Sequence, residues 1–394
     1  MALTLSKRAD KIVQAEIRVM TIECEKVSGI NLAQGVCDVG VPLPVARGAQ
    51  KAIDYGYNCY TRYDGLAELR KAIAHKLKVF NGVEVDPENE ITVSAGSTGA
   101  FYCACLALLD PGDEVILFEP YYGYHLNTLL AVDVIPKYVP MHLPDLKFTL
   151  DDLERVVTKK TKGIMVCTPS NPSGKVFSEK ELKIIADFAI RHDLFVFTDE
   201  IYEYFIYDGN SHISPYSIPE ISDRTIMISG YSKTFSITGW RIGYSVSKKK
   251  WADMIGYVND LVYVCGPAPL QMGVAAGILE LTPAYYENLC QEFKAKRDKI
   301  CDALNRVGLT PIIPQGAYYV LADASRLPGK SSKEKAMFLL EKTGVASVPG
   351  MAFYHDDGGE NLLRFCFAKT DDVLDEACKR ILTLPPIPPL FNYQ

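Results

Sequence analysis

The chain has 394 residues and carries 42 lysines and arginines against 48 aspartates and glutamates, a formal net charge of −6. Nucleic-acid binding needs a basic surplus, so this charge argues against nucleic acid as the main partner. Hydrophobic residues make up 48% of the chain and charged residues 23%, which is typical of globular proteins and excludes gross disorder and collagen-like structure. At roughly 150 residues per domain, the length predicts two or three domains.

Cysteines and histidines give no sign of a metal site. The 11 cysteines are dispersed without a C-x-x-C motif, and the 6 histidines stand singly, so no metal is expected. Dispersed thiols suit a reducing compartment, where they act as small buried hydrophobic side chains. No apolar signal segment and no run of membrane-spanning length is found, so we expect a cytoplasmic protein without membrane contact.

Strand-like and helix-like segments alternate from about residue 50 onward. Helical spacing predicts helices, in chain order, over 65–80, 97–109, 179 onward, 267–280 and 283–307. Short apolar runs predict strands over 91–93, 115–118, 163–167, 194–197, 225–228, 242–246, 318–321 and 362–367. Ser178 and Glu181 form a capping box that starts one helix, and Asp110-Pro-Gly-Asp113 is a turn.

The alternation predicts an α/β fold. Continuous apolar runs between amphipathic helices favour a mainly parallel sheet covered by helices on both faces. The helix-rich region after about residue 250 favours a second, smaller α/β domain, and the Pro-rich segment 385–389 is interpreted as a terminal extension. Ligands bind at the carboxyl ends of parallel strands, so the loops after residues 93, 118, 167, 197 and 228 are the places to look.

The segment SGYSKTFSITGWRIG gives the strongest functional signal. Lys233 in a crowded pocket would have a lowered pKa and act as an imine-forming nucleophile, and Arg241 could hold a phosphate. The alternative for Lys233 alone is a surface lysine in a turn. Its neighbours decide between the two.

Three further loops carry polar groups. Asp199 ends an apolar strand and could pair with a protonated pyridine nitrogen, or simply form a salt bridge or helix cap. Tyr202 follows three residues later and could reach the same ligand, and Asn171 stands between two prolines after another strand. The small residues 94–99 precede an apolar helix, whose N-terminus could seat a phosphate. Pyridoxal 5′-phosphate combines the phosphate, ring nitrogen, phenolic oxygen and aldehyde that these groups would bind.

In combination, the NPSG, TDEIY and SKTFSITGWRIG motifs resemble those of the class I/II aminotransferases of fold type I, the aspartate aminotransferase-like family, from about Asn31 to residue 383. The resemblance implies a large cofactor-binding domain with a mainly parallel seven-stranded sheet, over 46–290. It also implies a smaller α/β domain made of 1–45 and 291–394. The expected assembly is a homodimer with shared active sites.

The resemblance also implies the cofactor contacts. Lys233 would bind pyridoxal phosphate covalently and shuttle the substrate proton, and Asp199 would pair with its ring nitrogen. Asn171 and Tyr202 would donate to its phenolic oxygen. The expected phosphate ligands are Arg241, Ser97, Thr98, Ser232 and, from the neighbouring subunit, Tyr60.

Substrate contacts follow in the same way. Arg364 would bind the substrate α-carboxylate, because an arginine inside an apolar strand needs an anionic partner; a structural Arg–carboxylate pair is the alternative. Gly35 would lie beside that carboxylate. Tyr122 would stack on the cofactor ring, unless it is a core aromatic. Candidate pocket tyrosines, with packing as the alternative, are Tyr121, Tyr124 and Tyr318.

Some positions depart from the family pattern. The segment 36–44 replaces a run that usually covers the substrate. Gly230 removes one possible hydroxyl contact to phosphate, which Ser229 or Ser232 could replace. No arginine can be assigned to a distal substrate carboxylate.

The resemblance implies amino acid:2-oxo acid transamination with ping-pong kinetics in amino acid metabolism, with aspartate or aromatic donors and 2-oxoglutarate as the acceptor. One alternative is elimination on the same fold, as in C–S β-lyases or aminocyclopropane-carboxylate synthases. Another is the aminotransferase-like module of transcription regulators, disfavoured by the acidic charge and the lack of room for a winged helix before residue 30. The intact residue set disfavours a silent homologue.

Overall fold

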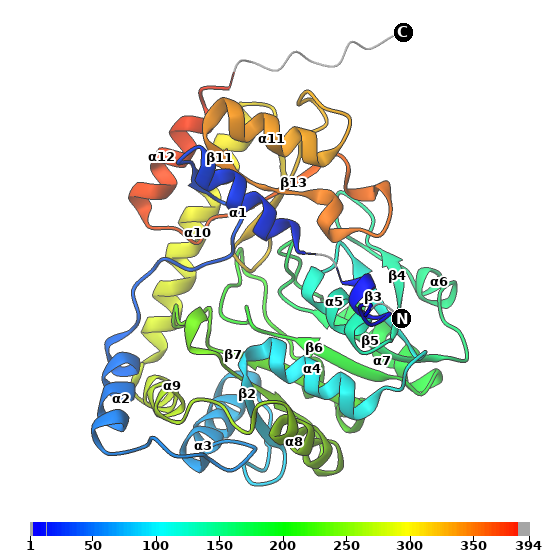
Figure 1. Cartoon of the computed structure of the whole chain (residues 1–394), viewed down its shortest axis with the longest axis vertical. Coiled ribbons are helices and arrows are strands. Elements are labelled where there is room, and N and C mark those ends of the chain that lie inside the picture. Colours follow the sequence, from blue (N-terminus) through cyan, green and yellow to red (C-terminus); the bar gives the residue numbers. More distant parts are fainter. Residues whose placement is uncertain (1–2, 13, 385–394) are drawn as a thin grey trace.

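The computed structural model describes residues 3–12 and 14–384; the Pro-rich segment 385–389 lies outside the described residues. The strands form three sheets, of seven, four and two strands. Figure 1 shows the seven-stranded sheet in the lower part of the molecule and the smaller sheets in the upper part, with the long helix α10 (Pro283–Arg306) running between them.

The large sheet has the strand order β2-β8-β7-β6-β5-β3-β4. Only β8 runs antiparallel to its neighbours, so the sheet is mainly parallel as predicted. Its strands are β2 (Ile91–Ala95), β3 (Glu114–Glu119), β4 (Ile135–Pro140), β5 (Thr161–Cys167), β6 (Phe195–Asp199), β7 (Thr225–Gly230) and β8 (Ile242–Val246).

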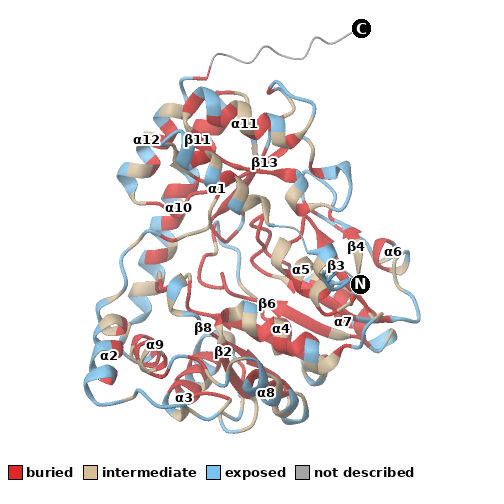
Figure 2. Ribbon diagram, in the orientation of Figure 1, coloured by how far each residue is buried: buried red, intermediate tan, exposed pale blue. Residues whose placement is uncertain are grey.

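Helices cover both faces of this sheet, because successive residues of a strand point to opposite sides. Val115 and Leu117 of β3 pack in a cluster with residues of α4 and α5, whereas Ile116 packs in another with residues of α7. Figure 2 shows that the strands at the centre of the sheet are buried.

The described helices are α1 (Glu16–Lys26), α2 (Leu43–Asp54), α3 (Ala67–Lys76), α4 (Gly96–Leu108), α5 (Gly123–Ala131), α6 (Leu150–Glu154), α7 (Glu179–Arg191), α8 (Lys249–Tyr263), α9 (Ala268–Glu280), α10, α11 (Ser332–Thr343) and α12 (Asp371–Ile381).

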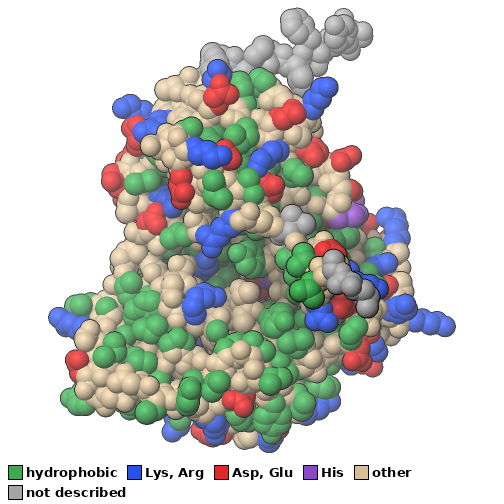
Figure 3. Space-filling view, viewed as in Figure 1, with side chains coloured by type: hydrophobic (Ala, Val, Ile, Leu, Met, Phe, Trp, Pro, Cys, Tyr) green, Lys and Arg blue, Asp and Glu red, His purple; other side chains and the backbone are tan. Residues whose placement is uncertain are grey.

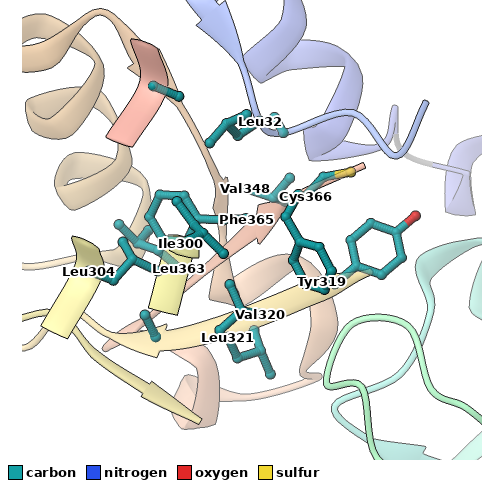
Figure 4. Close-up of a cluster of buried hydrophobic side chains, with 14 of the residues drawn as sticks. Leu32, Ile300, Leu304, Tyr319, Val320, Leu321, Val348, Leu363, Phe365 and Cys366 are labelled. Atoms are coloured by element: carbon teal, nitrogen blue, oxygen red, sulfur yellow. The ribbon is translucent and has the colours of Figure 1, made fainter. Parts of the chain in front are cut away.

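The smaller sheets join the N-terminal segment to the C-terminal part of the chain. β1 (Ile30–Asn31) pairs in parallel with β11 (Val345–Ala346). The antiparallel four-stranded sheet has the order β12-β13-β10-β9, made of β9 (Thr310–Ile312), β10 (Tyr319–Asp323), β12 (Val348–Pro349) and β13 (Leu362–Cys366). Figure 4 shows Leu32 packed with side chains of α10, β10 and β13 in the core of this part. The domain boundaries at residues 45 and 290 stay predictions.

The predicted helices and strands are confirmed with small shifts at their ends. The capping box is present: the Ser178 side chain accepts from the Glu181 amide, and the Glu181 carboxylate accepts from the Ser178 amide. The cysteines are free and most are buried, although Cys59 is exposed. Within residues 3–12 and 14–384, no helix is long and apolar enough to cross a membrane.

Candidate active site

A cavity of about 520 Å³ lies where the carboxyl edge of the large sheet faces β10, β13 and the N-terminal segment. Figure 3 shows a hollow in the middle of the molecular face, bordered by basic side chains. With the exception of Tyr60, every residue predicted to contact the cofactor or the substrate α-carboxylate lines the cavity, namely Gly35, Ser97, Thr98, Tyr122, Asn171, Asp199, Tyr202, Ser232, Lys233, Arg241 and Arg364.

The topology explains this convergence. All strands of the large sheet except β8 point the same way, so their carboxyl ends share one edge. Each of the five loops singled out from the sequence therefore contributes lining residues. Strand direction thus brings together the loops of the large sheet, while Gly35, Tyr319 and Arg364 reach the cavity from the N-terminal segment and the four-stranded sheet.

Lys233 follows β7 and is partly buried in the cavity wall. Its Nζ donates to the Gly35 carbonyl oxygen at 3.2 Å and lies 5.9 Å from the centre of the Tyr318 ring. Burial, together with the nearby Arg241 charge, lowers the pKa of Lys233 to about 8. The side chain is therefore not an ordinary surface lysine, and a substantial fraction of its amine is neutral near physiological pH.

Asp199 is paired with a histidine that the sequence analysis did not identify. His125 Nε2 lies 2.9 Å from Asp199 Oδ2, and both side chains are buried. His125 packs edge-on against Tyr122 at 5.2 Å between ring centres. The signal in the sequence was its position one helical turn after Tyr122, on a helix that leaves the carboxyl edge of the sheet.

The N-terminus of α4 and Arg241 meet closely. Gly96 has a φ of +75°, and a Cβ on it would lie 2.2 Å from Arg241 Nη2. A Cβ on Gly243 would lie 2.4 Å from the Ser97 amide nitrogen. Arg241 Nη1 donates to the Thr238 carbonyl at 2.9 Å, which fixes the guanidinium beside the helix start. The free amides of the helix start and the fixed arginine together form an anion-binding site.

Arg364 is fully buried in β13. Its Nη1 donates to Asn171 Oδ1 at 2.9 Å and its Nη2 donates to the Ala33 carbonyl, while Nε is buried without a partner. Its Cζ lies 4.3 Å from the centre of the Tyr319 ring. Among the described residues no carboxylate pairs with Arg364, so the alternative of a structural ion pair is wrong. A buried unpaired charge is costly unless an anion joins it.

Two tyrosine hydroxyl groups also belong to the cavity wall. The Tyr202 hydroxyl lies 3.0 Å from that of Tyr319, and burial raises the pKa of both, so they remain neutral hydrogen-bond donors. A Cβ on Gly35 would lie 1.9 Å from the Tyr319 hydroxyl oxygen, so only glycine fits there.

The structure decides between the two serines that could replace a hydroxyl at Gly230. Ser229 is fully buried and donates toward Glu200 and Glu203, away from the cavity. Ser232 lines the cavity.

Of the candidate pocket tyrosines, Tyr124 lines the cavity, but Tyr121 and Tyr318 do not. Tyr319, the first residue of β10, lines it instead. The Tyr318 ring packs beside it at 4.9 Å between ring centres, and the Tyr318 hydroxyl donates to the Gly35 carbonyl oxygen at 3.3 Å. Tyr60 is 84% exposed and lies outside the cavity of its own chain.

Comparison with known proteins identifies the relatives of this chain. A family model described as aminotransferase class I and II matches residues 27–381. Aspartate aminotransferase from Pyrococcus abyssi is 35% identical over 384 residues, covering 96% of this chain and 97% of the relative. Kynurenine–oxoglutarate transaminase 3 from Rattus norvegicus is 34% identical over 381 residues, covering 89% of this chain and 84% of the relative.

A solved structure agrees with these matches. N-succinyldiaminopimelate aminotransferase from Mycobacterium tuberculosis is similar with a TM-score of 0.93 and 33% identity, covering 97% of this chain and 100% of that chain. The relatives are named for different substrates and share transamination. The chain belongs to the class I and II aminotransferases, and it is a transferase of amino groups.

Proposed function

We propose that this aminotransferase uses pyridoxal 5′-phosphate and that the residues lining the cavity hold it. The observation that carries the proposal is the meeting, in one cavity, of a lysine with a lowered pKa, a buried carboxylate, a helix N-terminus beside an arginine, and a second arginine without a counter-ion. Each of these groups complements one part of the cofactor and its substrate.

The residues present fit the cofactor. Gly96 and Gly243 allow Arg241 and β8 to lie directly against the start of α4, since a Cβ at either position would clash, so a phosphate bound there would meet the arginine and the helix amides together. Ser97, Thr98 and Ser232 would add hydroxyl or amide donors. Asp199, fixed by His125, would hold a proton on the ring nitrogen. Asn171 and Tyr202 would donate to the phenolic oxygen, and Tyr122 would lie against the ring.

When bound, pyridoxal phosphate supplies an aldehyde that captures an amino group and a ring that accepts the electron pair left at Cα. Lys233 would perform the proton transfers. Its neutral amine would remove the Cα proton of the bound amino acid and return it to the carbon of the cofactor's aldehyde group. Burial keeps the pKa of this amine close to the working pH, where a general base is most effective.

Arg364 would bind the α-carboxylate of either substrate with its forked donors, while Gly35 allows the carboxylate to approach closely. Asn171 Oδ1 orients the guanidinium from one side and the Ala33 carbonyl from the other. Because the amino acid and the 2-oxo acid both carry this carboxylate, one site serves both halves of a ping-pong reaction.

We further propose that the active unit is a homodimer in which Tyr60 reaches the phosphate of the neighbouring site. Tyr60 is exposed and is not among the residues that line its own cavity, and large hydrophobic side chains on α2, α8 and the adjoining loops are also exposed. Exposed groups of this kind are typical of protein interfaces. They include Leu43, Ile53, Tyr55, Met254, Tyr257 and Leu261.

The donor and acceptor remain proposals at the level of class: aspartate or aromatic amino acids as donors and 2-oxoglutarate as the acceptor. The test is an absorbance spectrum of the purified protein with pyridoxal phosphate, before and after single amino acids are added without a 2-oxo acid. We expect the visible band of the lysine-bound cofactor to convert to the band of its amine form, stoichiometrically with a released 2-oxo acid.

The matched control is Lys233→Ala, which should lose both the visible band and turnover. Continuous release of pyruvate and ammonia in the same assay would instead indicate elimination. Undiminished transamination by Lys233→Ala would refute the role of the lysine.

A further inference from the structure

Arg18 lines the cavity from the first turn of α1. Its side chain is exposed, and its guanidinium forms no hydrogen bond or ion pair with any residue that the structure describes. Among the other cations of the N-terminal segment, Arg8 and Lys11 pair with Asp133 and Lys26 pairs with Glu23, while Lys7 has no partner among the described residues and does not line the cavity. Arg18 is thus a free cation at the cavity.

The backbone that carries Arg18 is held in place. Met20 and Cys24, one turn apart on α1, are buried in the same core as β11 and β13. Glu16 pairs with Lys333 of α11 at 2.6 Å. Since the helix is fixed on this side, the Arg18 side chain is presented to the cavity by a rigid element rather than by a loop.

The charges around the cavity identify what Arg18 is for. Of the residues that the structure describes, the lining contains four cationic side chains, those of Arg18, Lys233, Arg241 and Arg364, against one carboxylate, Asp199. Three of the cations are accounted for by the cofactor and the substrate α-carboxylate, and Asp199 is occupied by His125. The remaining positive charge has no anion assigned to it.

We propose that Arg18 determines substrate specificity by binding the side-chain carboxylate of dicarboxylic amino acids and 2-oxo acids. This inference rests on the proposed function, because it places the substrate α-carboxylate on Arg364. Phe101 and Tyr124 also line the cavity and can face an uncharged side chain. Because Arg18 is exposed and unpaired among the described residues, its guanidinium is free to extend into solvent when such a side chain is bound, so Arg18 would favour dicarboxylates without excluding other substrates.

Glutamate and glutamine test the proposal, because they have nearly the same shape and differ in the charge of the distal group. In Arg18→Gln we expect KM for glutamate to rise about tenfold, the loss expected for one charge-assisted hydrogen bond, with kcat little changed. KM for glutamine should stay the same. Arg18→Lys should recover part of the preference for glutamate. Lys26→Gln, on the same helix and outside the cavity lining, is the matched control and should behave as the wild type.

A binding measurement without turnover separates this inference from the proposed function. Calorimetry should show that glutarate binds the cofactor-loaded wild type more tightly than pentanoate, and that Arg18→Gln removes this difference. An unchanged ratio of glutamate to glutamine kcat/KM in Arg18→Gln, or a wild type without preference for the acidic member of each pair, would overturn the inference. If the wild type transaminated no amino acid at all, the proposed function itself would fail.

Discussion

His125 Nε2 and Asp199 Oδ2 lie 2.9 Å apart in the buried wall of the active-site cavity. Asp199 also accepts a hydrogen bond from the Ile201 amide at 3.3 Å. The carboxylate is thus held by one side chain and one backbone group, with its charge directed toward the cavity. This pair gives the first prediction.

Asp199→Asn keeps the shape of the side chain and removes its charge. We expect kcat to fall by about 100-fold, because a charge-assisted contact is worth roughly 1.5–3 kcal/mol and each 1.4 kcal/mol is tenfold. His125→Gln retains a hydrogen-bond donor and should cost much less. Steady-state kinetics on the three proteins would check this order. Equal losses in both variants would show that orientation by His125, and not the charge of Asp199, dominates.

Asp199 could be predicted from the sequence, whereas its pairing with His125 could not. Asp199 ends a strand, and strand ends of a parallel sheet converge whatever the rest of the fold does. The distance to His125 depends on how α5 packs against β6. Arg18 was missed for a similar reason: the place of α1 depends on the pairing of Ile30 with Val345, a contact between distant parts of the chain.

Local sequence patterns also do not predict which residues of a strand face the cavity or in which direction the strand runs in the sheet. The sequence Tyr318-Tyr319 gives no indication of which ring faces the cavity, and the structure places Tyr319 there. The antiparallel direction of β8 is likewise not visible in its apolar run, because a buried strand has the same composition in either direction. The loops with the predicted site residues could be identified because they carry polar side chains directly after apolar, buried strands.

The pKa of Lys233 predicts how its reactivity depends on pH. The neutral amine is the reactive form, so a pKa of about 8 means that reactivity rises as pH increases toward 8 and levels off above it. Below that pH the rate should increase about tenfold per unit. The measurement is the rate of pyridoxal phosphate attachment to the apoprotein, trapped with borohydride and assigned to the Lys233 peptide by mass spectrometry.

The control for this experiment is Lys233→Ala, which should lose the labelled peptide. An ordinary lysine has a pKa of about 10.4, so labelling that continued to rise through pH 10 would contradict an effect of burial.

The close approach of Arg241 to Gly96 at the start of α4 predicts that a larger residue at position 96 weakens cofactor binding. In Gly96→Ala the new Cβ would displace the Arg241 guanidinium, and the φ of +75° would strain any side chain. We expect the Kd for pyridoxal phosphate to rise about tenfold and the free energy of unfolding to fall by roughly 1–2 kcal/mol.

Gly239→Ala is the matched control, since Gly239 also lines the cavity but a Cβ there meets nothing within 4 Å. Fluorescence titration of the two apoproteins with pyridoxal phosphate would measure the Kd of each variant. Equal affinities for the two variants would show that Arg241 does not depend on the space that Gly96 leaves.

The exposure of Tyr60 predicts complementation between subunits. If Tyr60 acts in the neighbouring site, a dimer of one Lys233→Ala chain and one Tyr60→Ala chain contains one site with both residues intact and one with neither. Differently tagged chains would allow the mixed dimer to be purified. We expect its active site to bind pyridoxal phosphate with wild-type affinity, although the Tyr60→Ala homodimer binds it more weakly because a phosphate contact is missing. If Tyr60 instead served its own chain, the mixed dimer would show the weak affinity of Tyr60→Ala. A protein that stayed monomeric and fully active at assay concentration would exclude the shared site altogether.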